Sequence, residues 1–372
     1  MTRELTKADA LHGVLGGGVL ACGGGGWKRH GELMGDLATS LGRPSLASVR
    51  ELPEDTIVAT VTAIGAPAAE NWEIRPVDYL DALTTLMRQV DGRIGAVMTA
   101  QNGFSTTHNG WIQSAALGIP VLDAAGDVRA HPTGKLGSLG LGERPGYTCT
   151  AVVAGGNRQL AGRFVSINVG DVNTCDDVLR DISVRVGGFI ASARNPVELA
   201  WVKDHAALGA ISLALDLGEA MREAGAGRSG AGNAVAAAVA GALGAEVLAR
   251  GPLVFETPNV TKGGWDHGVF RVQDCLVPFL NEFMAVQQNG EWIFAYPATI
   301  CLLDGATGEP MAVERAVEGQ DCVLLAAPAS ALPVSSSAID PAGLAECAEL
   351  LGIDFLAQLD PNLRGGSNEY AR

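Results

Sequence analysis

The chain has 372 residues, of which 47% are hydrophobic and 18% are charged, and its formal net charge is −15. Such a composition excludes a disordered chain and provides a large core, while the length favours two domains. The acidic balance argues against nucleic acid or an anionic membrane surface as a partner. Seven cysteines without a CxxC pair argue against a disulfide framework, so we expect reduced thiols and a cytoplasmic location.

The first predicted elements surround a glycine-rich turn. Thr6 is a suitable cap for a helix that starts at Lys7, and a second helix is expected at about residues 30–41. Between them stand four consecutive glycines: Gly23, Gly24, Gly25 and Gly26. Because they leave backbone N–H groups accessible ahead of a helix, we expect them to hold an anionic or carbonyl group of a ligand. A tight packing turn is the alternative, and no nucleotide cofactor is expected because the spacing matches no nucleotide-binding motif.

Strands and helices then alternate along the chain. Strands are predicted at residues 56–64, 94–98 and 119–122, and helices at 76–87 and 111–117. This order indicates a parallel sheet with crossover helices, whose ligand crevice lies at the carboxyl ends of the strands. Asn102 and Asp123 directly follow apolar strand residues, so we expect both to face the crevice. Asp123 is a candidate general base or metal ligand, with a structural carboxylate as the alternative.

Polar side chains in the neighbouring loops complete the candidate site. Asn102 and Asn109 could hydrogen-bond the C=O and N–H groups of a ring imide, or they could cap a helix. Arg129 could clamp a substrate carboxylate or form a structural salt bridge, and His131 lies in the same loop. Cys22 could be a nucleophile if the loop amides lower the pKa of its thiol, although a small buried residue also fits this position.

The second half starts with helices and becomes rich in strands. Helices are predicted at residues 176–192 and 197–223, and strands from residue 253 onward, with a hairpin turn at Asn289-Gly290. The sequence therefore predicts an α/β protein of two domains. The N-terminal domain, residues 1–168, contains the parallel sheet. The C-terminal domain, residues 169–372, is helical at first and β-rich from about residue 252, and we expect the site in the cleft between the two.

Four groups of residues occur in one order across nearly the whole chain. They are Leu-Ala-Cys-Gly-Gly-Gly-Gly at residues 20–26, Leu-Gly-Ile-Pro-Val-Leu-Asp at 117–123, Ala-Arg-Asn-Pro at 193–196, and Asn281-Glu282 with the run at 300–310. In this ordered set the chain resembles the S-methyl thiohydantoin desulfurase family. The resemblance implies an N-terminal α/β domain, a strand-rich C-terminal domain, and a metal-assisted hydrolysis that cleaves a methylthio group from a hydantoin-like ring. It also favours Asn281 and Glu282 pointing into the cleft, rather than forming the polar face of a sheet.

The chain departs from this family at several positions where the family has an acidic residue. The residues found there instead are Trp27, Gln101, Asn102, Ala125, Thr133 and Ala298. Histidines could replace the missing ligands, because imidazole is a good ligand for zinc. The candidate ligands for a divalent metal, zinc or manganese, are His108, His131, His267 and Asp123. The chain therefore resembles a divergent member of the family.

Three functions are compatible with these residues. The first is a hydrolase of a hydantoin- or thiohydantoin-like cyclic amide or amidine, in which a metal, Asp123 or His131 activates water. The second is a non-catalytic accessory or ligand-binding subunit that assists a hydantoinase-type partner, which would explain the missing acids. The third is a hydrolase that depends on Cys22. The expected partners are a small-molecule substrate, and either a second copy of the chain or the hydantoinase-type protein.

Overall fold

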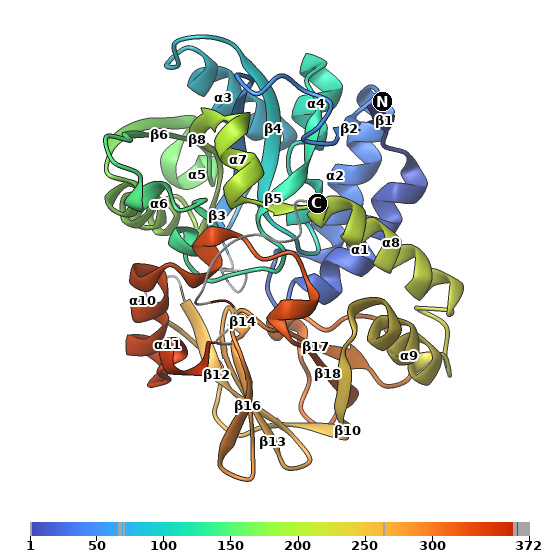
Figure 1. Ribbon diagram of the computed structural model, residues 1–372. Helices are drawn as coiled ribbons and strands as arrows, with labels where there is room; N and C mark the ends of the chain where they lie inside the picture. The colour runs from blue at the N-terminus through green and yellow to red at the C-terminus, as the bar shows by residue number, and fades with distance from the viewer. Residues whose placement is uncertain (1, 66–68, 70, 263–264, 360–362, 364–372) are drawn as a thin grey trace.

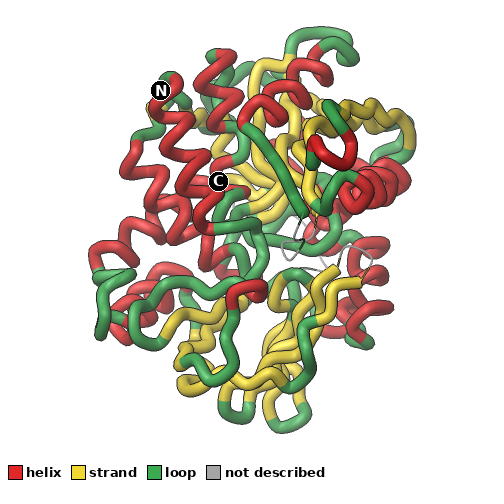
Figure 2. The backbone as a smooth tube through the Cα atoms, turned by 180° about the vertical axis from the view of Figure 1, so that it is seen from behind, coloured by secondary structure: helices red, strands yellow, loops and turns green. Residues whose placement is uncertain are grey.

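The computed structural model describes residues 2–65, 69, 71–262, 265–359 and 363, and it contains two β-sheets with helices around them (Figure 1). The first sheet lies in the upper part of Figure 1 and the second below it, and Figure 2 shows the same arrangement from behind. Each sheet contains nine strands of the described chain. The predicted α/β class is confirmed, with a sheet that contains parallel strands followed by a second, strand-rich unit.

The first sheet mixes parallel and antiparallel strands. Its strands are β1 (Arg3–Glu4), β2 (Ser45–Ala47), β3 (Ile57–Gly65), β4 (Ile94–Gln101), β5 (Val121–Asp127), β6 (Cys149–Gly155), β7 (Phe164–Gly170), β8 (Phe189–Glu198) and β9 (Ala207–Leu208). They follow the order β1-β2-β5-β4-β3-β8-β6-β7, and β9 pairs with β5. The three predicted strands β3, β4 and β5 run parallel as expected, and β2, which was not predicted, runs parallel to β5. The remaining strands pair in antiparallel fashion.

Helices cover both faces of the first sheet. They are α1 (Lys7–Leu20), α2 (Lys28–Leu41), α3 (Pro76–Met87), α4 (Trp111–Leu117), α5 (Arg158–Ala161), α6 (Val172–Arg185), α7 (Leu199–His205) and α8 (Ala210–Glu223). One face packs on α2, α3 and α4 around residues such as Leu83 and Trp111. The other face packs on α6 and α7 around residues such as Leu179 and Val202. Burial on both faces explains why strands such as β4 are apolar almost throughout.

Strand β8 is the main departure from the predicted elements. The sequence predicted a helix up to residue 192 and another at residues 197–223, but α6 ends at Arg185 and β8 follows, while the second predicted helix is divided into α7 and α8. β8 lies between β3 and β6 and pairs with both. Its residues are almost all buried, so burial in the sheet outweighs local helix propensity. The first sheet therefore extends beyond residue 168, where the domain boundary was expected, and that position falls within β7.

Helix α1 passes through three consecutive glycines, residues 16–18, before it ends at Leu20. These glycines allow unusually close packing, since a Cβ at Gly16 would lie 1.9 Å from the carbonyl oxygen of Ala214 in α8. A Cβ at Gly17 would lie 2.3 Å from Oγ1 of Thr107, in the loop that follows β4. The helix therefore contacts its neighbours at backbone distance, and this contact fixes the start of the four-glycine turn.

The second sheet is antiparallel. Its strands are β10 (Glu246–Phe255), β11 (Val260–Lys262), β12 (Trp265–Val272), β13 (Cys275–Leu280), β14 (Glu282–Phe283), β15 (Ala285–Gln288), β16 (Glu291–Ala295), β17 (Thr299–Asp304) and β18 (Asp321–Ala327). The order is β16-β15-β13-β12-β10-β18-β17, and α9 (Gly232–Leu243), α10 (Pro341–Leu351) and α11 (Phe355–Gln358) lie around it (Figure 1). Asn289 and Gly290 have positive φ and connect β15 to β16, which confirms the predicted hairpin.

Candidate functional site

The four-glycine turn connects α1 to α2 and adopts a backbone conformation that favours glycine. Gly23, Gly25 and Gly26 have φ values of 89°, 70° and 80°, where a side chain would be strained. A Cβ at Gly25 would also lie 2.5 Å from Cα of Gly103 in the loop after β4. The turn therefore packs its backbone directly against the carboxyl end of a parallel strand.

The same turn also contacts the second half of the chain. The carbonyl oxygen of Cys22 accepts a hydrogen bond of 2.6 Å from the N–H of Phe283 in β14. A Cβ at Gly24 would lie 2.0 Å from Oε1 of Glu282, and the backbone of Gly25 hydrogen-bonds the carboxyl group of Glu282. The absence of side chains in the turn is thus what allows Glu282 to approach the first sheet.

A cavity lies where the turn, the first sheet and β14 meet. It leaves about 60 Å³ for the centres of water-sized molecules, which is room for several waters. Gly25 and Gly26 line it, together with the carboxyl ends of β3 and β4. The polar side chains in its lining belong to Thr62, Gln101, Thr106, His131, Asp176, Arg180, Arg194, Asn281 and Glu282. The cavity therefore occupies the predicted edge of the parallel sheet, between the two halves of the chain.

Four residues of this lining have a buried polar atom without a hydrogen-bond partner among the described residues. The atoms are Thr106 Oγ1, His131 Nε2, Arg194 Nε and Glu282 Oε2. Buried polar atoms in folded proteins are almost always hydrogen-bonded. In this cavity, ordered water or a ligand with its own donors and acceptors would supply the missing hydrogen bonds.

Glu282 is held in an environment that favours the protonated carboxyl group. Burial raises its pKa to about 8, although the positive charges of Arg129 and Arg180 oppose the shift. The side chain is therefore mostly uncharged at neutral pH. A carboxyl group that titrates near neutral pH is suited to donate and accept protons in a reaction.

His131 is held as a neutral imidazole. Oε1 of Gln101 accepts hydrogen bonds from the backbone N–H of His131 at 3.0 Å and from its Nδ1 at 2.8 Å. With the proton on Nδ1, Nε2 carries a lone pair and can accept a hydrogen bond. Burial, reinforced by the charges of Arg129 and Arg194, lowers the pKa of His131 to about 3.

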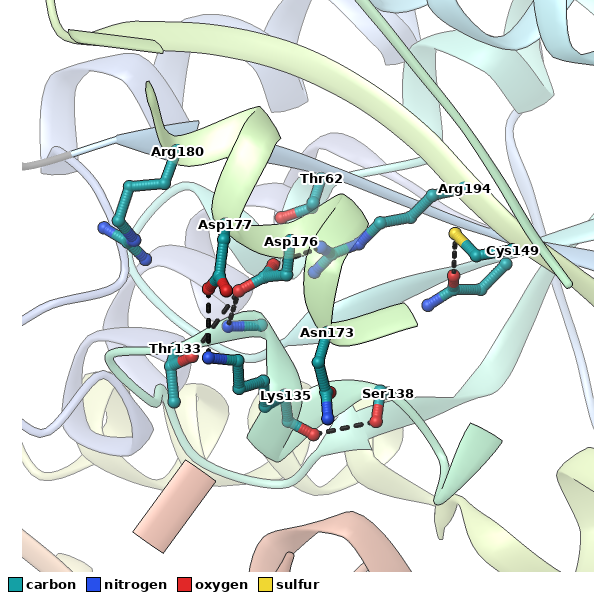
Figure 3. Close-up of polar contacts among 12 residues, drawn as sticks. Thr62, Thr133, Lys135, Ser138, Cys149, Asn173, Asp176, Asp177, Arg180 and Arg194 are labelled. Carbon is teal, nitrogen blue, oxygen red and sulfur yellow. Dashed lines mark hydrogen bonds and ion pairs between the residues drawn. The ribbon is translucent and has the colours of Figure 1, made fainter. Parts of the chain in front are cut away.

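A buried ion pair forms one wall of the cavity. Figure 3 shows Arg194 of β8 extending toward Asp176 of α6, and the two side chains are 2.7 Å apart. Asp176 also accepts a hydrogen bond from the backbone N–H of Gly134 at 3.1 Å. Burial by itself would raise the pKa of Asp176, but Arg194 and Arg180 outweigh it and lower the pKa. Both groups are therefore ionised. Asp176 accepts a hydrogen bond from one terminal nitrogen of Arg194, while Nε of Arg194 has no partner within the described residues.

Arg180 adds a second positive charge to the lining. Its guanidinium group donates a hydrogen bond of 2.7 Å to the carbonyl oxygen of Pro132 and lies 4.0 Å from the ring centre of Trp265. Arg180 and Asp176 both lie on α6, in a segment that the sequence predicted as an ordinary helix. Their role was missed because nothing in a single helical segment indicates which strand it will face.

Comparison with known proteins identifies the family. Residues 9–163 match the family model of the S-Me-THD-like N-terminal domain, and residues 170–346 match that of the S-Me-THD-like C-terminal domain. The chain belongs to the S-Me-THD-like family. This confirms the resemblance to S-methyl thiohydantoin desulfurases and indicates a thiohydantoin-related function.

The fold of this S-Me-THD-like protein is shared with a solved structure. An X-ray crystal structure of a protein from Chromobacterium violaceum matches it with a TM-score of 0.70 and 20% sequence identity, over 94% of this chain and 98% of that chain. No curated protein matches the chain. None of the helices in the described residues is long and apolar enough to span a membrane.

Two residues expected to face the crevice are occupied elsewhere. The carboxylate of Asp123 accepts hydrogen bonds from the backbone N–H groups of Ile211 and Ser212 and from the Ser212 hydroxyl, at 3.1, 2.9 and 2.6 Å. It therefore satisfies the first turn of α8. Asn102 is buried and donates to the carbonyl oxygens of Val128 and Ala210 at 3.0 and 2.9 Å. Neither residue lines the cavity, because tertiary contacts with α8 take up their polar groups.

Arg129 does not line the cavity, and its guanidinium group contacts the backbone of the chain. It is fully buried, and its guanidinium nitrogens donate to the carbonyl oxygens of Ala130, Phe283 and Ala298. The last two oxygens belong to the second half of the chain, so Arg129 connects the two halves. Asn109 is buried as well, with Nδ2 3.5 Å from Oγ1 of the cavity residue Thr62.

Cys22 lacks the features of an activated nucleophile. Burial raises the pKa of its thiol to about 11, despite the opposing charge of Arg129, so the thiol stays protonated at neutral pH. Cys22 is also not among the residues that line the cavity. Asn281 and Glu282, by contrast, both line the cavity, as the resemblance implied.

The residues predicted as metal ligands do not come together. His108 lies in the core, where its Nε2 is 2.9 Å from the carbonyl oxygen of Ala10, and burial lowers its pKa to about 4. His267 is half-buried in β12, opposite Leu280 of β13. Among the described residues, no three His, Cys, Asp or Glu side chains form a group that could hold a metal ion. The donors present therefore do not fit the metal that the resemblance implies, and Asp123 and His131 do not combine with these histidines.

Proposed function

We propose that this S-Me-THD-like protein hydrolyses a small hydantoin- or thiohydantoin-like ring bound in the cavity beside Gly25 and Gly26. The observation that carries the proposal is the set of four unpartnered polar atoms around that cavity. Arg194 supplies a donor, His131 supplies an acceptor, and the hydroxyl of Thr106 can do either. A hydantoin-type ring presents C=O and N–H groups close together, so this set of side chains is complementary to it.

Glu282 is the residue best suited to transfer protons, since its pKa of about 8 lies close to neutral pH. In its acid form it protonates the nitrogen of the ring C=N bond, and the neighbouring carbon becomes more electrophilic. Water then adds to this carbon with formation of a C–O bond, and Glu282 takes up a proton from the added water. As the C=O bond forms, the C–S bond breaks, and the remaining hydroxyl proton leaves with the sulfur as methanethiol.

His131 and Arg194 hold the reacting groups in this scheme. The neutral His131 accepts a hydrogen bond at Nε2 from the attacking water, and Gln101 keeps it in the required tautomer. Arg194 donates from Nε to the ring carbonyl oxygen, while Asp176 fixes its orientation. Donors held in advance stabilise negative charge as it develops on oxygen. The proposal uses neither Cys22 nor Asp123 as a reacting group.

The direct test is release of methanethiol from an S-methyl thiohydantoin by the purified full-length chain, measured by gas chromatography. We expect turnover by the wild-type protein, and a fall in kcat of about 10²–10⁴-fold in Glu282→Gln, which keeps the shape of the side chain but removes its proton transfer. Glu349→Gln is the matched control, because Glu349 is an exposed carboxylate on α10. Thermal melting of both variants separates loss of chemistry from loss of folding.

The possible outcomes distinguish between the candidate functions. Full activity in Glu282→Gln would remove Glu282 from the mechanism, and no turnover by a folded wild-type chain, with or without added zinc or manganese, would contradict a hydrolase. Activity that appears only with a hydantoinase-type protein would instead favour the accessory subunit.

A further inference from the structure

The two ends of the first sheet present different edges. At one end, β1 contains only Arg3 and Glu4, both exposed, so this edge is short and charged. At the other end, β7 has seven residues, Phe164–Gly170, with neither proline nor charge. Among the described strands, β7 pairs only with β6, which is labelled at the left of Figure 1. Short or charged edges resist pairing with other strands, whereas a long uncharged edge favours it.

Strand β7 also exposes a row of apolar side chains. Val165, Ile167 and Val169 lie on one face with exposed fractions of 41%, 45% and 66%, while Phe164 on the opposite face packs against the core. All three exposed residues are β-branched, and such residues stabilise cross-strand contacts. The strand therefore combines unpaired backbone groups with side chains that favour a neighbouring strand.

We propose that β7 pairs with β7 of a second copy of this chain, antiparallel about a two-fold axis at Ile167, and so joins two first sheets into one. In this register Val165 of each copy faces Val169 of the other, and Ile167 faces its own counterpart. Such a contact is isologous and closes after two copies, as expected for the commonest kind of homodimer. The inference is independent of the reaction proposed for the cavity.

Charge complementarity supports a second copy as the occupant. Arg163 directly precedes β7, and Asp171 directly follows it. In the same register, Arg163 of each copy lies opposite Asp171 of the other copy, so opposite charges meet at both ends of the paired strands. The side chain of Arg163 is 74% exposed, although it also contacts Asp81 at 2.8 Å, while Asp171 caps α6. A parallel arrangement would instead place like charges opposite each other, which is unfavourable. The charges of residues 163–171 are therefore complementary to those of the same segment in an antiparallel second copy, although the whole chain is strongly acidic.

The test measures the mass of the full-length chain in solution by sedimentation velocity with light scattering. At about 1–100 µM, where homodimers of moderate affinity form, we expect the mass of two chains. Variants with Val165→Lys and Val169→Lys together, or Val165→Glu and Val169→Glu together, should each be monomeric because like charges face each other. An equimolar mixture of the two should regain the dimer, because opposite charges then meet at every Val165–Val169 pair.

The mixture makes the test specific for the register. A dimer can re-form in the mixture only if both variants are folded. Leu33→Lys is the matched control, since Leu33 is an exposed apolar residue on α2, 56% exposed, and this variant should remain dimeric. A monomeric wild-type chain over this concentration range would overturn the proposal. So would a dimer that persists in the lysine variant, or a mixture that stays monomeric.

Discussion

Two buried arginines, Arg129 and Arg194, lie at the junction between the two halves of the chain and differ in how they are used. Arg129 donates from all three guanidinium nitrogens to backbone carbonyl oxygens, two of them in the second half. Arg194 forms an ion pair with Asp176, but its Nε has no partner among the described residues. Each guanidinium nitrogen of Arg129 thus already donates to a backbone carbonyl oxygen, whereas Nε of Arg194 donates to none of the described residues.

The surroundings of the two arginines also differ. Beside Arg129, the hydroxyl of Tyr296 donates a hydrogen bond of 2.6 Å to Oδ2 of Asp127, and the Tyr296 ring centre is 5.0 Å from the guanidinium carbon. Oδ1 of Asp127 has no partner among the described residues. Beside Arg194, the cavity contains further unpartnered atoms, including those of His131 and Glu282. Polar groups that satisfy one another hold two parts of a fold together, whereas unsatisfied ones remain available for a ligand.

The largest effect on stability is expected from Arg129→Met. Removing this side chain leaves three buried carbonyl oxygens without their donor and separates Asp127 from its nearest positive charge, so we expect a loss of about 3–5 kcal/mol in the free energy of unfolding. Urea denaturation measures it. Lys28→Met is the control, because Lys28 forms an exposed ion pair with Glu309, and such pairs contribute about 0–1 kcal/mol. Equal losses in the two variants would show that Arg129 does not connect the halves.

An effect of similar size, but dependent on pH, is expected at Glu282. Its pKa is raised in the folded chain, so its contribution to stability is complete below the ordinary pKa of 4.5 and is lost as the pH rises toward 8. Glu282→Gln does not ionise, so it should gain stability relative to wild type between pH 5 and pH 9. The gain is about 1.4 kcal/mol for each unit of the pKa shift, and urea denaturation at both pH values measures it. A difference that does not change with pH would mean that Glu282 is not buried as the structure has it.

The smallest effect is expected from Cys22→Ala. Removal of one buried sulfur should cost about 1 kcal/mol of stability. Methanethiol release should stay within about twofold of wild type, because the protonated thiol of Cys22 does not line the cavity. Loss of turnover in a variant that melts normally would support the Cys22-dependent hydrolase and contradict the division between structural and ligand-binding groups.

Local patterns predicted much of the architecture. The β-branched and apolar runs at β3, β4 and β5 indicated a parallel sheet, and the structure has it. The hairpin at Asn289-Gly290 was predictable because this dipeptide favours positive φ at both residues. Strand β8 was not predictable from its own residues, because its conformation depends on insertion between two strands that are distant in the sequence.

The candidate site was predicted only in part. Gly25, Gly26, His131, Asn281 and Glu282 line the cavity as expected, and their roles in binding or catalysis stay predictions. Asn102 follows β4 as the sequence indicated, whereas Asp123 lies within β5, which continues to Asp127, and the start of α8 occupies polar groups of both residues. The sequence around a strand carboxylate gives no sign of whether a helix or a ligand will be its partner.

The sequence by itself determined the conformations that depend on neighbouring residues, above all the glycine turn, and it identified the family through an ordered set of short motifs. The tertiary structure alone decided which side chains share the cavity, since Gly25, His131, Asp176, Arg194 and Glu282 come from segments far apart in the chain. It also decided their chemistry. The pKa of Glu282 and the free nitrogen of Arg194 depend on burial and on contacts between these segments, and such contacts exist only after the chain has folded.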